Sequence, residues 1–451
     1  MFQKVLIANR GEIAVRIIRA CRELGLSTVA VCSEADIYAI HAQIADETIC
    51  IGPPPIKESY LNIPAILSAC EISGAQAVHP GYGFLSENAN FARHLEDRGI
   101  IFVGPSSKSI EQMGDKAKAK QTMMAAGVTV IPGSDGAVND LARAADAAAG
   151  TGFPLLVKAC AGGGGRGIRM AYDPSQFEAA VTAACGEAET AFGDDRVYLE
   201  KLIAGPRHIE IQILADNYGN IIHLGERDCS IQRRYQKIIE ECPSPSPLMT
   251  RLLREKMGEV AINAAKAVDY QGAGTVEFLL DRSGKFYFME MNTRIQVEHP
   301  ITEEIVGLDL VKAQLQIAQG SRLEVAQEEI QMRGHAIECR ISAECPEQGF
   351  RPSPGRVESL FVPDGAGIRM DGGIYAGYNI PPHYDSMIAK LIAHAPTRRE
   401  AIVKMREALS RFVIKGIDTN IDFHLRLLSN PQFIAGDYHI GTLEKIVTSL
   451  Y

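Results

Sequence analysis

Short apolar runs alternate with amphipathic stretches along the first hundred residues. The runs are KVLIA, STVAVC, TICIG, AQAVHPG and IIFVGP, all between Lys4 and Pro105. Between the first two, residues 12–24 place apolar side chains on one helical face, and Gly25 follows as a helix-capping residue. This alternation predicts βαβ units and a parallel sheet of Rossmann-like architecture. The connecting turn NRGE lacks the G-x-G of a dinucleotide fingerprint, so we do not expect NAD binding.

The pattern changes near Gly114, where a helix is predicted over residues 115–126. A Pro/Gly-rich break at residues 131–136 then leads into a compact βα piece that ends near Ala204. This piece carries KACAGGGGRGIRM, residues 158–170, in which the lysine precedes four consecutive glycines. Such glycines suit a phosphate cradle or a hinge, and the order of residues fits neither a Walker A loop nor a dinucleotide fingerprint. Glycine hinges at both ends of the piece favour a lid.

Hairpins are predicted between residues 208 and 299. HIEIQILAD alternates and returns as IIHLGERDC after the turn NYGN, while GTVEFLL pairs with KFYFMEMN across the turn DRSG. After Leu310 the chain has a helix, a strand at HAIECRI, several short strands and a helix near residues 400–412. This last part is predicted to be a third domain of mixed α/β type.

The second of these hairpins carries candidate metal ligands. With a four-residue turn, Leu280 pairs with Lys285, which puts Glu277, Glu290 and Asn292 on one face of the hairpin. Two carboxylates and an amide oxygen are the ligands that Mg²⁺ takes beside nucleotide phosphates. A solvated polar face is the alternative, and the apolar character of the remaining hairpin residues argues against it.

The segment NTRIQVEH comes directly afterwards, with Arg294, Gln296 and Glu298 at alternate positions. In an extended chain these three share one face, where a cation, an amide and a carboxylate would bind a small oxyanion and deprotonate it. A surface ladder of ion pairs is the alternative, and the neighbouring metal ligands favour the functional interpretation. Lys116 opens a predicted helix, whose N-terminus favours phosphate. Arg340 fits a buried ion pair and a site residue equally well.

Composition and charge restrict the classes of function. The 451 residues are 46% hydrophobic and 22% charged, as in globular proteins, and give room for roughly three domains. A formal net charge of −9 argues against nucleic-acid binding and against binding to an anionic membrane surface. The sequence has no run long enough to span a membrane, no C-x-x-C pair among its ten cysteines, and a strand-like run directly after Met1. We therefore expect a cytoplasmic or otherwise reducing compartment.

Several motifs taken together resemble those of biotin carboxylase, a family of the ATP-grasp superfamily. They are NRGEIAVRIIRAC, HPGYGFLSENANFA, MGDK, the glycine loop, GERDCSIQRRYQK and EMNTRIQVEHP, and they occur in order and with matching spacing from residue 3 to about residue 445. The resemblance implies an α/β protein with an α+β core. It implies a Rossmann-like domain over residues 1–113, an ATP-grasp domain over 114–330 with a mobile lid over about 132–204, and a mixed α/β C-terminal domain over 331–447.

The resemblance also implies roles for individual residues of this sequence. For magnesium, with manganese as a substitute, it implies two ions and the ligands Glu277, Glu290 and Asn292. For bicarbonate and biotin it implies Lys237, Arg294, Gln296, the backbone of Val297, Glu298 as general base and Arg340. For ATP it implies Lys116, Lys158, Gly164, Gly165, Glu200, Lys201, Leu202, Ile203, His208, Gln232, Tyr235, Glu277, Leu279, Glu290 and Ile440.

The expected reaction is the ATP- and bicarbonate-dependent carboxylation of biotin through carboxyphosphate. Because the chain ends near Tyr451 without a biotinyl or carboxyltransferase domain, the resemblance implies a stand-alone subunit that works on a biotin carboxyl carrier protein beside carboxyltransferase subunits. Acetyl-CoA carboxylase is the preferred assembly, and pyruvate or another oxo acid or acyl-CoA is the alternative acceptor. An ATP-grasp ligase that joins a carboxylate to an amine and a catalytically silent nucleotide-binding subunit remain open.

The sequence departs from the family pattern in three places. Tyr235 stands where His or Asn is common, and Cys160-Ala161 stands where one form has Ser-Gly. Ala366 replaces a Phe at the dimer contact of some relatives, whereas Arg19, Glu23 and Arg369 are retained. We expect a homodimer.

Overall fold

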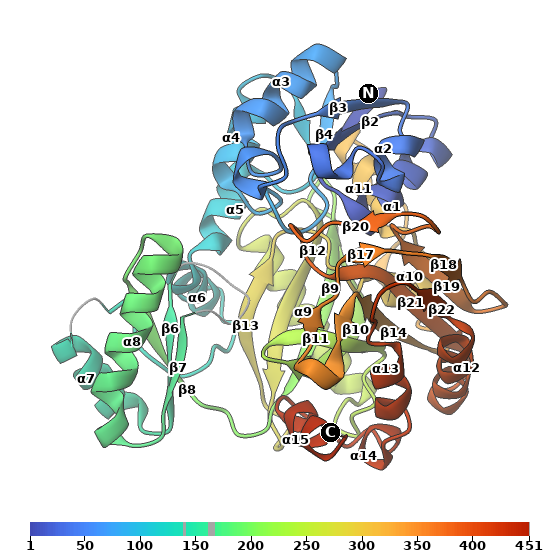
Figure 1. The fold of residues 1–451 in the computed structure, drawn as a ribbon. Helices are drawn as coiled ribbons and strands as arrows, with labels where there is room; N and C mark the ends of the chain where they lie inside the picture. The colour runs from blue at the N-terminus through green and yellow to red at the C-terminus, as the bar shows by residue number, and fades with distance from the viewer. Residues whose placement is uncertain (139–140, 161–166, 451) are drawn as a thin grey trace.

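The computed structural model describes the fold of residues 1–138, 141–160 and 167–450. Its N-terminal part is a five-stranded parallel sheet in the order β3-β2-β1-β4-β5, flanked by helices (Figure 1). The strands are β1 Lys4–Ile7, β2 Ser27–Cys32, β3 Glu47–Cys50, β4 Ala77–His79 and β5 Ile101–Phe102. The helices are α1 Gly11–Glu23, α2 Ile40–Ile44, α3 Ile63–Ser73, α4 Ala89–Glu96 and α5 Ser107–Gly114. The predicted parallel sheet is confirmed.

A smaller unit projects from the rest of the molecule, at the left of Figure 1. Its antiparallel sheet has the order β7-β6-β8, and its apolar core includes Leu155, Val157, Ala184 and Leu199. It contains β6 Leu155–Ala159, β7 Ile168–Ala171, β8 Val197–Lys201, α7 Leu141–Thr151 and α8 Pro174–Phe192, and it follows α6 Lys116–Ala125. This is the βα piece that the sequence predicts. Gly164 and Gly165 lie outside the described residues.

The largest element is an antiparallel sheet of eight strands in the order β13-β12-β9-β10-β11-β14-β21-β19. It runs without a break from the hairpin region into the C-terminal part of the chain, because β11 pairs with β14. Its strands are β9 Arg207–Ala215, β10 Ile221–Arg233, β11 Gln236–Cys242, β12 Gly272–Leu280, β13 Phe286–Asn292, β14 His335–Ser342, β19 Ile368–Gly372 and β21 Met387–Ala395.

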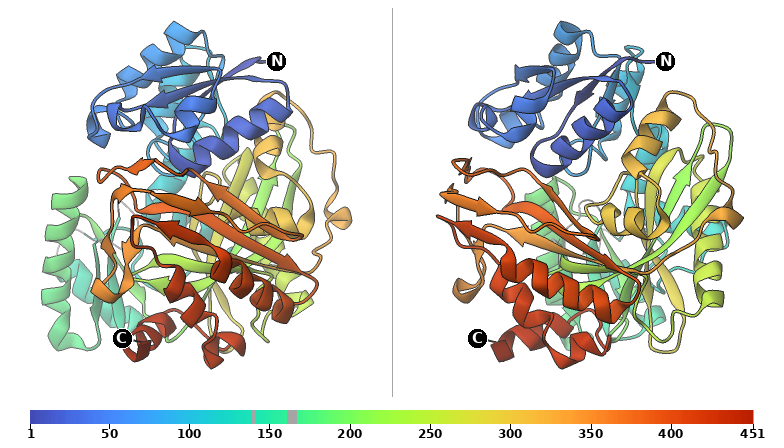
Figure 2. Two further views of the ribbon diagram at one scale, coloured as in Figure 1. Left: turned by 45° about the vertical axis from the view of Figure 1, so that its right-hand side comes forward. Right: turned by 90° about the vertical axis from the view of Figure 1, so that its right-hand side faces the viewer.

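Helices and short strands surround this sheet. The two views of Figure 2 place the N-terminal part on one side of the C-terminal strands and the last helices on the other. The helices are α9 Arg251–Lys266, α10 His299–Val306, α11 Leu310–Ala318, α12 Arg398–Arg411, α13 Ile421–Leu427, α14 Pro431–Ile434 and α15 Thr442–Leu450. The short strands are β15 Glu344–Cys345, β16 Arg351–Pro352, β17 Gly355–Arg356, β18 Ser359–Phe361, β20 Asn379–Ile380 and β22 Val413–Lys415. None of the described helices is long and apolar enough to cross a membrane.

The hairpin β12–β13 differs from its predicted register. Leu280 pairs with Phe286, so the predicted pairing of Leu280 with Lys285 is wrong by one residue. The cause lies in the loop, where an Asp281 carboxylate oxygen accepts the backbone N–H groups of Ser283 and Lys285 at 2.8 and 3.0 Å and keeps Lys285 out of the strand. A bulge next to Glu277 then adds one residue on the partner strand, so that Glu277 and Glu290 stand directly opposite each other.

The Glu241 carboxylate joins four parts of the C-terminal region. It accepts hydrogen bonds from His335 Nε2 at 2.8 Å, Arg398 Nε at 2.7 Å and the Tyr438 hydroxyl at 2.7 Å, and its side chain is only 1% exposed. Burial alone would raise the pKa of this carboxyl group. The hydrogen bonds from His335 and Arg398 outweigh burial and lower the pKa to about 2.

This lowered pKa predicts a loss of stability in acid. A carboxyl group whose folded pKa is depressed stabilises the fold above its unfolded pKa and loses that contribution as the pH falls. Because the pKa falls from 4.5 to about 2, Glu241 contributes about 3 kcal/mol near neutral pH. We expect Glu241→Gln to remove most of the fall in unfolding free energy between pH 4.5 and pH 2. Urea titrations at several pH values measure it, with the exposed Glu255→Gln as control, and an unchanged acid limb in the Glu241 variant would contradict the assignment.

Candidate active site

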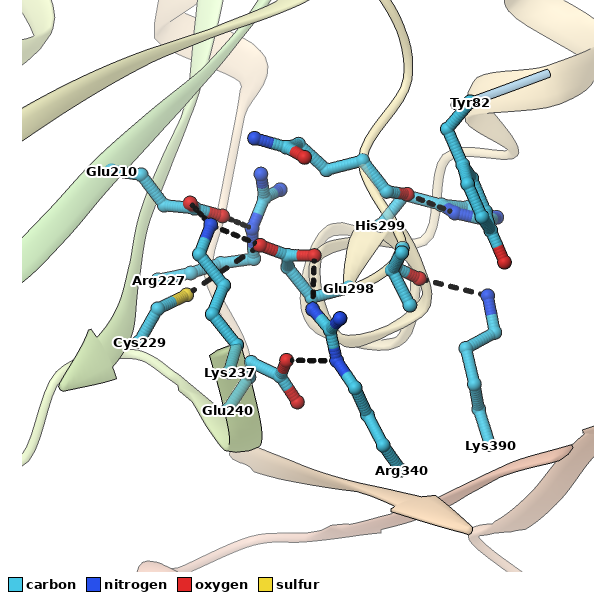
Figure 3. Close-up of polar contacts among 12 residues, drawn as sticks. Tyr82, Glu210, Arg227, Cys229, Lys237, Glu240, Glu298, His299, Arg340 and Lys390 are labelled. Carbon is cyan, nitrogen blue, oxygen red and sulfur yellow. Dashed lines mark hydrogen bonds and ion pairs between the residues drawn. The ribbon is translucent and has the colours of Figure 1, made fainter. Parts of the chain in front are cut away.

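Charged side chains project from neighbouring strands of the eight-stranded sheet toward one another. Figure 3 shows Glu210 from β9, Arg227 from β10, Lys237 from β11 and Arg340 from β14. Glu277 comes from β12, which pairs with β9. Glu277, Glu210 and Arg340 stand between buried apolar residues, whereas Arg227 stands between the buried Glu226 and Asp228. Because alternate residues of a strand share a face, the sheet collects these groups into one buried cluster.

Lys237 occupies the middle of this cluster. Its Nζ lies 2.6 Å from Glu210 Oε2, 2.9 Å from Glu277 Oε1 and 2.6 Å from Glu298 Oε1. Burial would lower the pKa of this lysine, but the three carboxylates raise it well above its usual value. A two-residue turn at Arg234 and Tyr235, both with positive φ, ends β10 and starts β11 and so fixes the position of Lys237.

Glu298 lies between two cations. Its Oε1 contacts Lys237, and its Oε2 accepts a hydrogen bond from Arg340 Nη2 at 3.0 Å. Although burial would raise the pKa of this carboxyl group, Lys237 and Arg340 hold it well below the usual range. The thiol of Cys229 donates to the same Oε1 at 3.7 Å, and burial raises the pKa of Cys229 well above its usual value. Glu298 is therefore an ionised carboxylate, the form that accepts a proton.

The segment before α10 is a loop, so the predicted extended strand with alternate side chains is wrong here. Glu298 is the residue before the helix, and the chain turns at residues 293–298. Arg294 Nη1 donates to Gln296 Oε1 at 2.8 Å, and Gln296 Nε2 donates to Glu277 Oε1 at 3.0 Å. Arg294 Nε also donates to Glu87 Oε2 at 2.8 Å. These contacts shape the loop so that Arg294, Gln296 and Glu298 still lie around the same cluster.

The candidate metal ligands form two adjoining groups. Glu277 Oε2 lies 3.1 Å from His208 Nε2, whereas Glu290 Oε2 lies 2.7 Å from Lys116 Nζ. Asn292 Oδ1 accepts a hydrogen bond from Arg294 Nη2 at 3.2 Å. Two carboxylates and an amide oxygen from paired strands are hard oxygen donors, so this donor set fits Mg²⁺. In this structure lysine ammonium groups balance the two carboxylates.

The smaller α/β unit contributes a cation and a carboxylate, and the preceding helix α6 contributes two further lysines. Lys158 Nζ on β6 lies 2.9 Å from Glu200 Oε2 on β8, and Lys120 Nζ lies 3.9 Å from the other oxygen of Glu200. Burial opposes the charge of Lys116, but Glu290 raises its pKa. Glu200 likewise raises the pKa of Lys158 against burial. Lys116 and Lys158 therefore remain charged near the hairpin β12–β13, as phosphate-binding groups would.

The remaining predicted nucleotide residues occupy different positions. Lys201 Nζ donates to the carbonyl oxygens of residues 152 and 153, so its side chain turns into the small unit. Gln232 Nε2 and His208 Nδ1 are 2.8 Å apart, and Leu279 pairs with His208 across β9 and β12. The backbone N–H of Leu202 donates to the carbonyl of Pro154, and that of Ile440 donates to the carbonyl of Pro206. Ile203 is partly buried, and the side chain of Tyr235 is 48% exposed.

Sequence reasoning missed several residues of the cluster. Glu210 and Arg227 are directly paired across β9 and β10 and are fully buried. Glu240 accepts a hydrogen bond from Arg340 Nε at 2.6 Å, and Glu87 anchors Arg294. For Glu210 and Glu240 the signal was a charged residue beside isoleucine in a predicted strand, as in HIEIQIL and KIIEEC. Arg227, between Glu226 and Asp228, and Glu87, in a loop, carry no such signal.

Three protein-family profiles together match most of the chain. They are "Biotin carboxylase, N-terminal domain" over residues 1–110, "Carbamoyl-phosphate synthase L chain, ATP binding domain" over 115–326 and "Biotin carboxylase C-terminal domain" over 338–445. The sequence is 56% identical over 445 residues to a biotin carboxylase of Nostoc sp., and the match covers 99% of each chain. It is 52% identical over 445 residues to one of the pyruvate carboxylase subunits of Methanothermobacter thermautotrophicus, and that match covers 99% of this chain and 90% of the relative.

The fold has an equally close counterpart among solved structures. The biotin carboxylase domain of the Hydrogenobacter thermophilus 2-oxoglutarate carboxylase, a dimer in complex with MgADP, ADP and bicarbonate, superposes with a TM-score of 0.96. It is 50% identical in sequence, and the match covers 99% of this chain and 98% of that one. Together with the two matched biotin carboxylase domains and the near-complete relatives, this places the chain in the biotin carboxylase family of ATP-dependent ligases.

Proposed function

We propose that the chain carboxylates biotin on a biotin carboxyl carrier protein, with ATP and bicarbonate as the other substrates and carboxyphosphate as the intermediate. The observation that carries this proposal is the ionised Glu298, which lies between Lys237 and Arg340. Lys237 also contacts Glu277, the proposed metal ligand. The relative from Hydrogenobacter thermophilus supports it, since its crystals hold MgADP and bicarbonate.

In the first step bicarbonate would lie against Lys237, Arg294, Gln296 and the backbone N–H of Val297. Glu298 would take its proton, and the resulting oxygen would attack the γ-phosphate of ATP. That step forms an O–P bond and breaks the bond to ADP, which gives carboxyphosphate. Lys116 and Lys158 supply positive charge near the phosphates, so the enzyme acts mainly by positioning and charge neutralisation.

In the second step carboxyphosphate would break into CO₂ and phosphate, and the phosphate would take the ureido proton of biotin. Arg340 would stabilise the ureido anion by donating hydrogen bonds to its oxygen, and the anion would then attack CO₂ to form carboxybiotin. Because Arg340 donates a hydrogen bond to Glu298, the same side chain would contact both the proposed base and biotin.

Glu277, Glu290 and Asn292 would hold two Mg²⁺ ions, or Mn²⁺ in their place, which would neutralise charge on the nucleotide phosphates. The adenine would lie along the segment of Glu200, Lys201, Leu202 and Ile203, for which the backbone is available because the Lys201 side chain turns away. His208, Gln232, Tyr235, Leu279 and Ile440 would border this pocket, and the loop with Gly164 and Gly165 would cover the phosphates.

We further propose three functional parts, residues 1–113, 114–330 with a lid over about 132–204, and 331–447. A homodimer is supported by the dimeric relative and by the retained Arg19, Glu23 and Arg369. All ten cysteines have free thiols, which suits the cytoplasm. Acetyl-CoA carboxylase is the proposed assembly, with carboxyltransferase subunits as further partners. The similarity to pyruvate and 2-oxoglutarate carboxylases keeps pyruvate and other oxo acids as alternative acceptors.

Bicarbonate-dependent ATP hydrolysis in the presence of free biotin tests this function. We expect biotin to accelerate phosphate release and radiolabelled bicarbonate to appear in carboxybiotin. An ATP-grasp ligase for an amine would show neither effect, and a silent nucleotide-binding subunit would bind ATP without hydrolysing it. Reconstitution with a biotinylated carrier and either an acetyl-CoA or a pyruvate carboxyltransferase then distinguishes the acceptors, because only the matching transferase turns over.

A further inference from the structure

Two buried glutamates face each other behind Arg340. Glu240 on β11 and Glu338 on β14 are direct partners in the antiparallel ladder, and both side chains are fully buried. Glu240 Oε1 accepts the Arg340 Nε–H at 2.6 Å. The other oxygen of Glu240 and both oxygens of Glu338 have no hydrogen-bond partner among the described residues. Neither glutamate has a role in the proposed chemistry.

The charges around this pair do not balance two carboxylates. Arg340 is shared between Glu240 and Glu298, so it cannot fully neutralise either of them. Lys237 and Lys390 also lie nearby, but Lys237 is shared among Glu210, Glu277 and Glu298. Lys390 Nζ donates to the carbonyl of Val297 at 2.8 Å (Figure 3) and lies 3.2 Å from Glu12 Oε1. The titratable and charged groups around the pair are Arg340, Lys390, Lys237, Glu298, Tyr82, Cys229 and Cys339, and Glu12 and His299 interact in turn with Lys390.

We propose that Glu240 and Glu338 share one proton and thereby hold Arg340 in the orientation that serves Glu298 and biotin. Two carboxyl groups directly opposed across a ladder cannot both ionise in a buried site without strong repulsion. With one proton, the protonated carboxyl donates to its partner and the pair carries a single negative charge. That charge pairs with Arg340 Nε, so that the Nη groups face the active site, where Nη2 donates to Glu298.

The titration of the two groups agrees with this geometry. Burial raises the pKa of Glu240 to about 7, against the opposing effect of Arg340. Burial raises the pKa of Glu338 well above its usual value, Glu240 and Glu298 raise it further, and Lys390 and Arg340 oppose the rise. Loss of the shared proton at alkaline pH would place a second anion against Arg340. This anion would compete with the biotin ureido group for the same guanidinium, so the pair sets an alkaline limit on carboxylation.

Glu338→Gln is the direct test of the shared proton. In infrared difference spectra at pH 7, wild type minus variant should show the carbonyl band of a protonated carboxylic acid. The stability should respond as well, since a raised folded pKa makes the wild type lose stability as pH rises from 4.5 to about 7 and beyond. The decline of Tm over this range should be shallower in the Gln variant. Glu407→Gln, an exposed change on α12, should leave band and slope unchanged.

The activity readout separates this role from a merely structural one. The inference about Arg340 rests on the proposed function, and Glu338→Gln should move the alkaline limb of kcat/KM for biotin upward by about one pH unit. Glu240→Gln removes the anion that orients Arg340, so the KM for biotin should rise about tenfold and kcat should change by a smaller factor.

Two different failures are distinguishable. If neither variant loses a carboxylic acid band and the Tm profiles coincide with the wild type, the pair is doubly ionised and the inference is wrong. If the wild type forms no carboxybiotin, the proposed function fails while the infrared and Tm tests still decide the shared proton. Should Glu338→Gln not fold, Glu240→Gln gives the same infrared test, because an amide on either side removes the shared proton.

Discussion

Glu298→Gln should lower kcat for biotin carboxylation by a factor of about 10³, within the range for loss of a general base. The amide has the size of the carboxylate and still accepts a hydrogen bond from Lys237 or Arg340, but it takes no proton from bicarbonate. The wild-type carboxylate is ionised because Lys237 at 2.6 Å and Arg340 at 3.0 Å hold its pKa low. Fixation of radiolabelled bicarbonate into biotin measures the loss.

Binding measurements show whether this loss is chemical. ATP affinity, determined by calorimetric titration, should stay within about twofold of the wild type, because Glu298 contacts other residues of the site and is not among the proposed nucleotide ligands. Glu324→Gln, a change at an exposed glutamate, serves as the activity control. Carboxylation within tenfold of the wild type would mean that another group is the base.

The hairpin β12–β13 illustrates what a sequence can predict. Its alternating pattern correctly indicated that Glu277 and Glu290 share a face, although the assumed pairing was wrong. A loop longer by one residue would have moved Glu290 to the opposite face, since a slip of one residue exchanges the faces of a strand. The bulge at Met289 adds a second residue and restores the arrangement. The two offsets cancel, and neither the loop contacts of Asp281 nor the bulge is visible in an alternating pattern.

The rest of the site depends on contacts between distant parts of the chain. Arg294 is anchored by Glu87, 207 residues away, and this contact belongs to a loop where alternation had predicted an extended strand. Glu240 and Arg340 are 100 residues apart in the chain and meet because β11 pairs with β14. Local periodicity predicts single strands and helices, but the order of strands in a sheet is set by tertiary packing. Buried charges such as Arg227 are therefore recognised only when their partners are in place.

Arg227→Met should destabilise the protein by about 3–5 kcal/mol, the cost of breaking a buried ion pair from one side. Arg227 is fully buried and donates to Glu210 at 2.5 Å, Gln212 at 2.7 Å, Thr302 at 2.9 Å and Thr275 at 3.1 Å. Without it, Glu210 keeps Lys237, which also serves two other carboxylates, and the more distant His208 Nε2 at 3.9 Å. Urea unfolding measures the change, followed by circular dichroism because the chain has no tryptophan.

A second variant shows whether charge or volume causes this loss. In Arg227→Met with Glu210→Gln, no uncompensated anion remains, so we expect the double variant to recover about 1–3 kcal/mol of the loss. Arg251→Met removes an arginine that is 89% exposed and paired within α9, and it should not change the unfolding midpoint measurably. Strictly additive effects of the two core substitutions would instead assign the loss to packing around the methionine. In that case Arg227 would not be the group that neutralises Glu210, and Lys237 would keep Glu210 and Glu298 ionised.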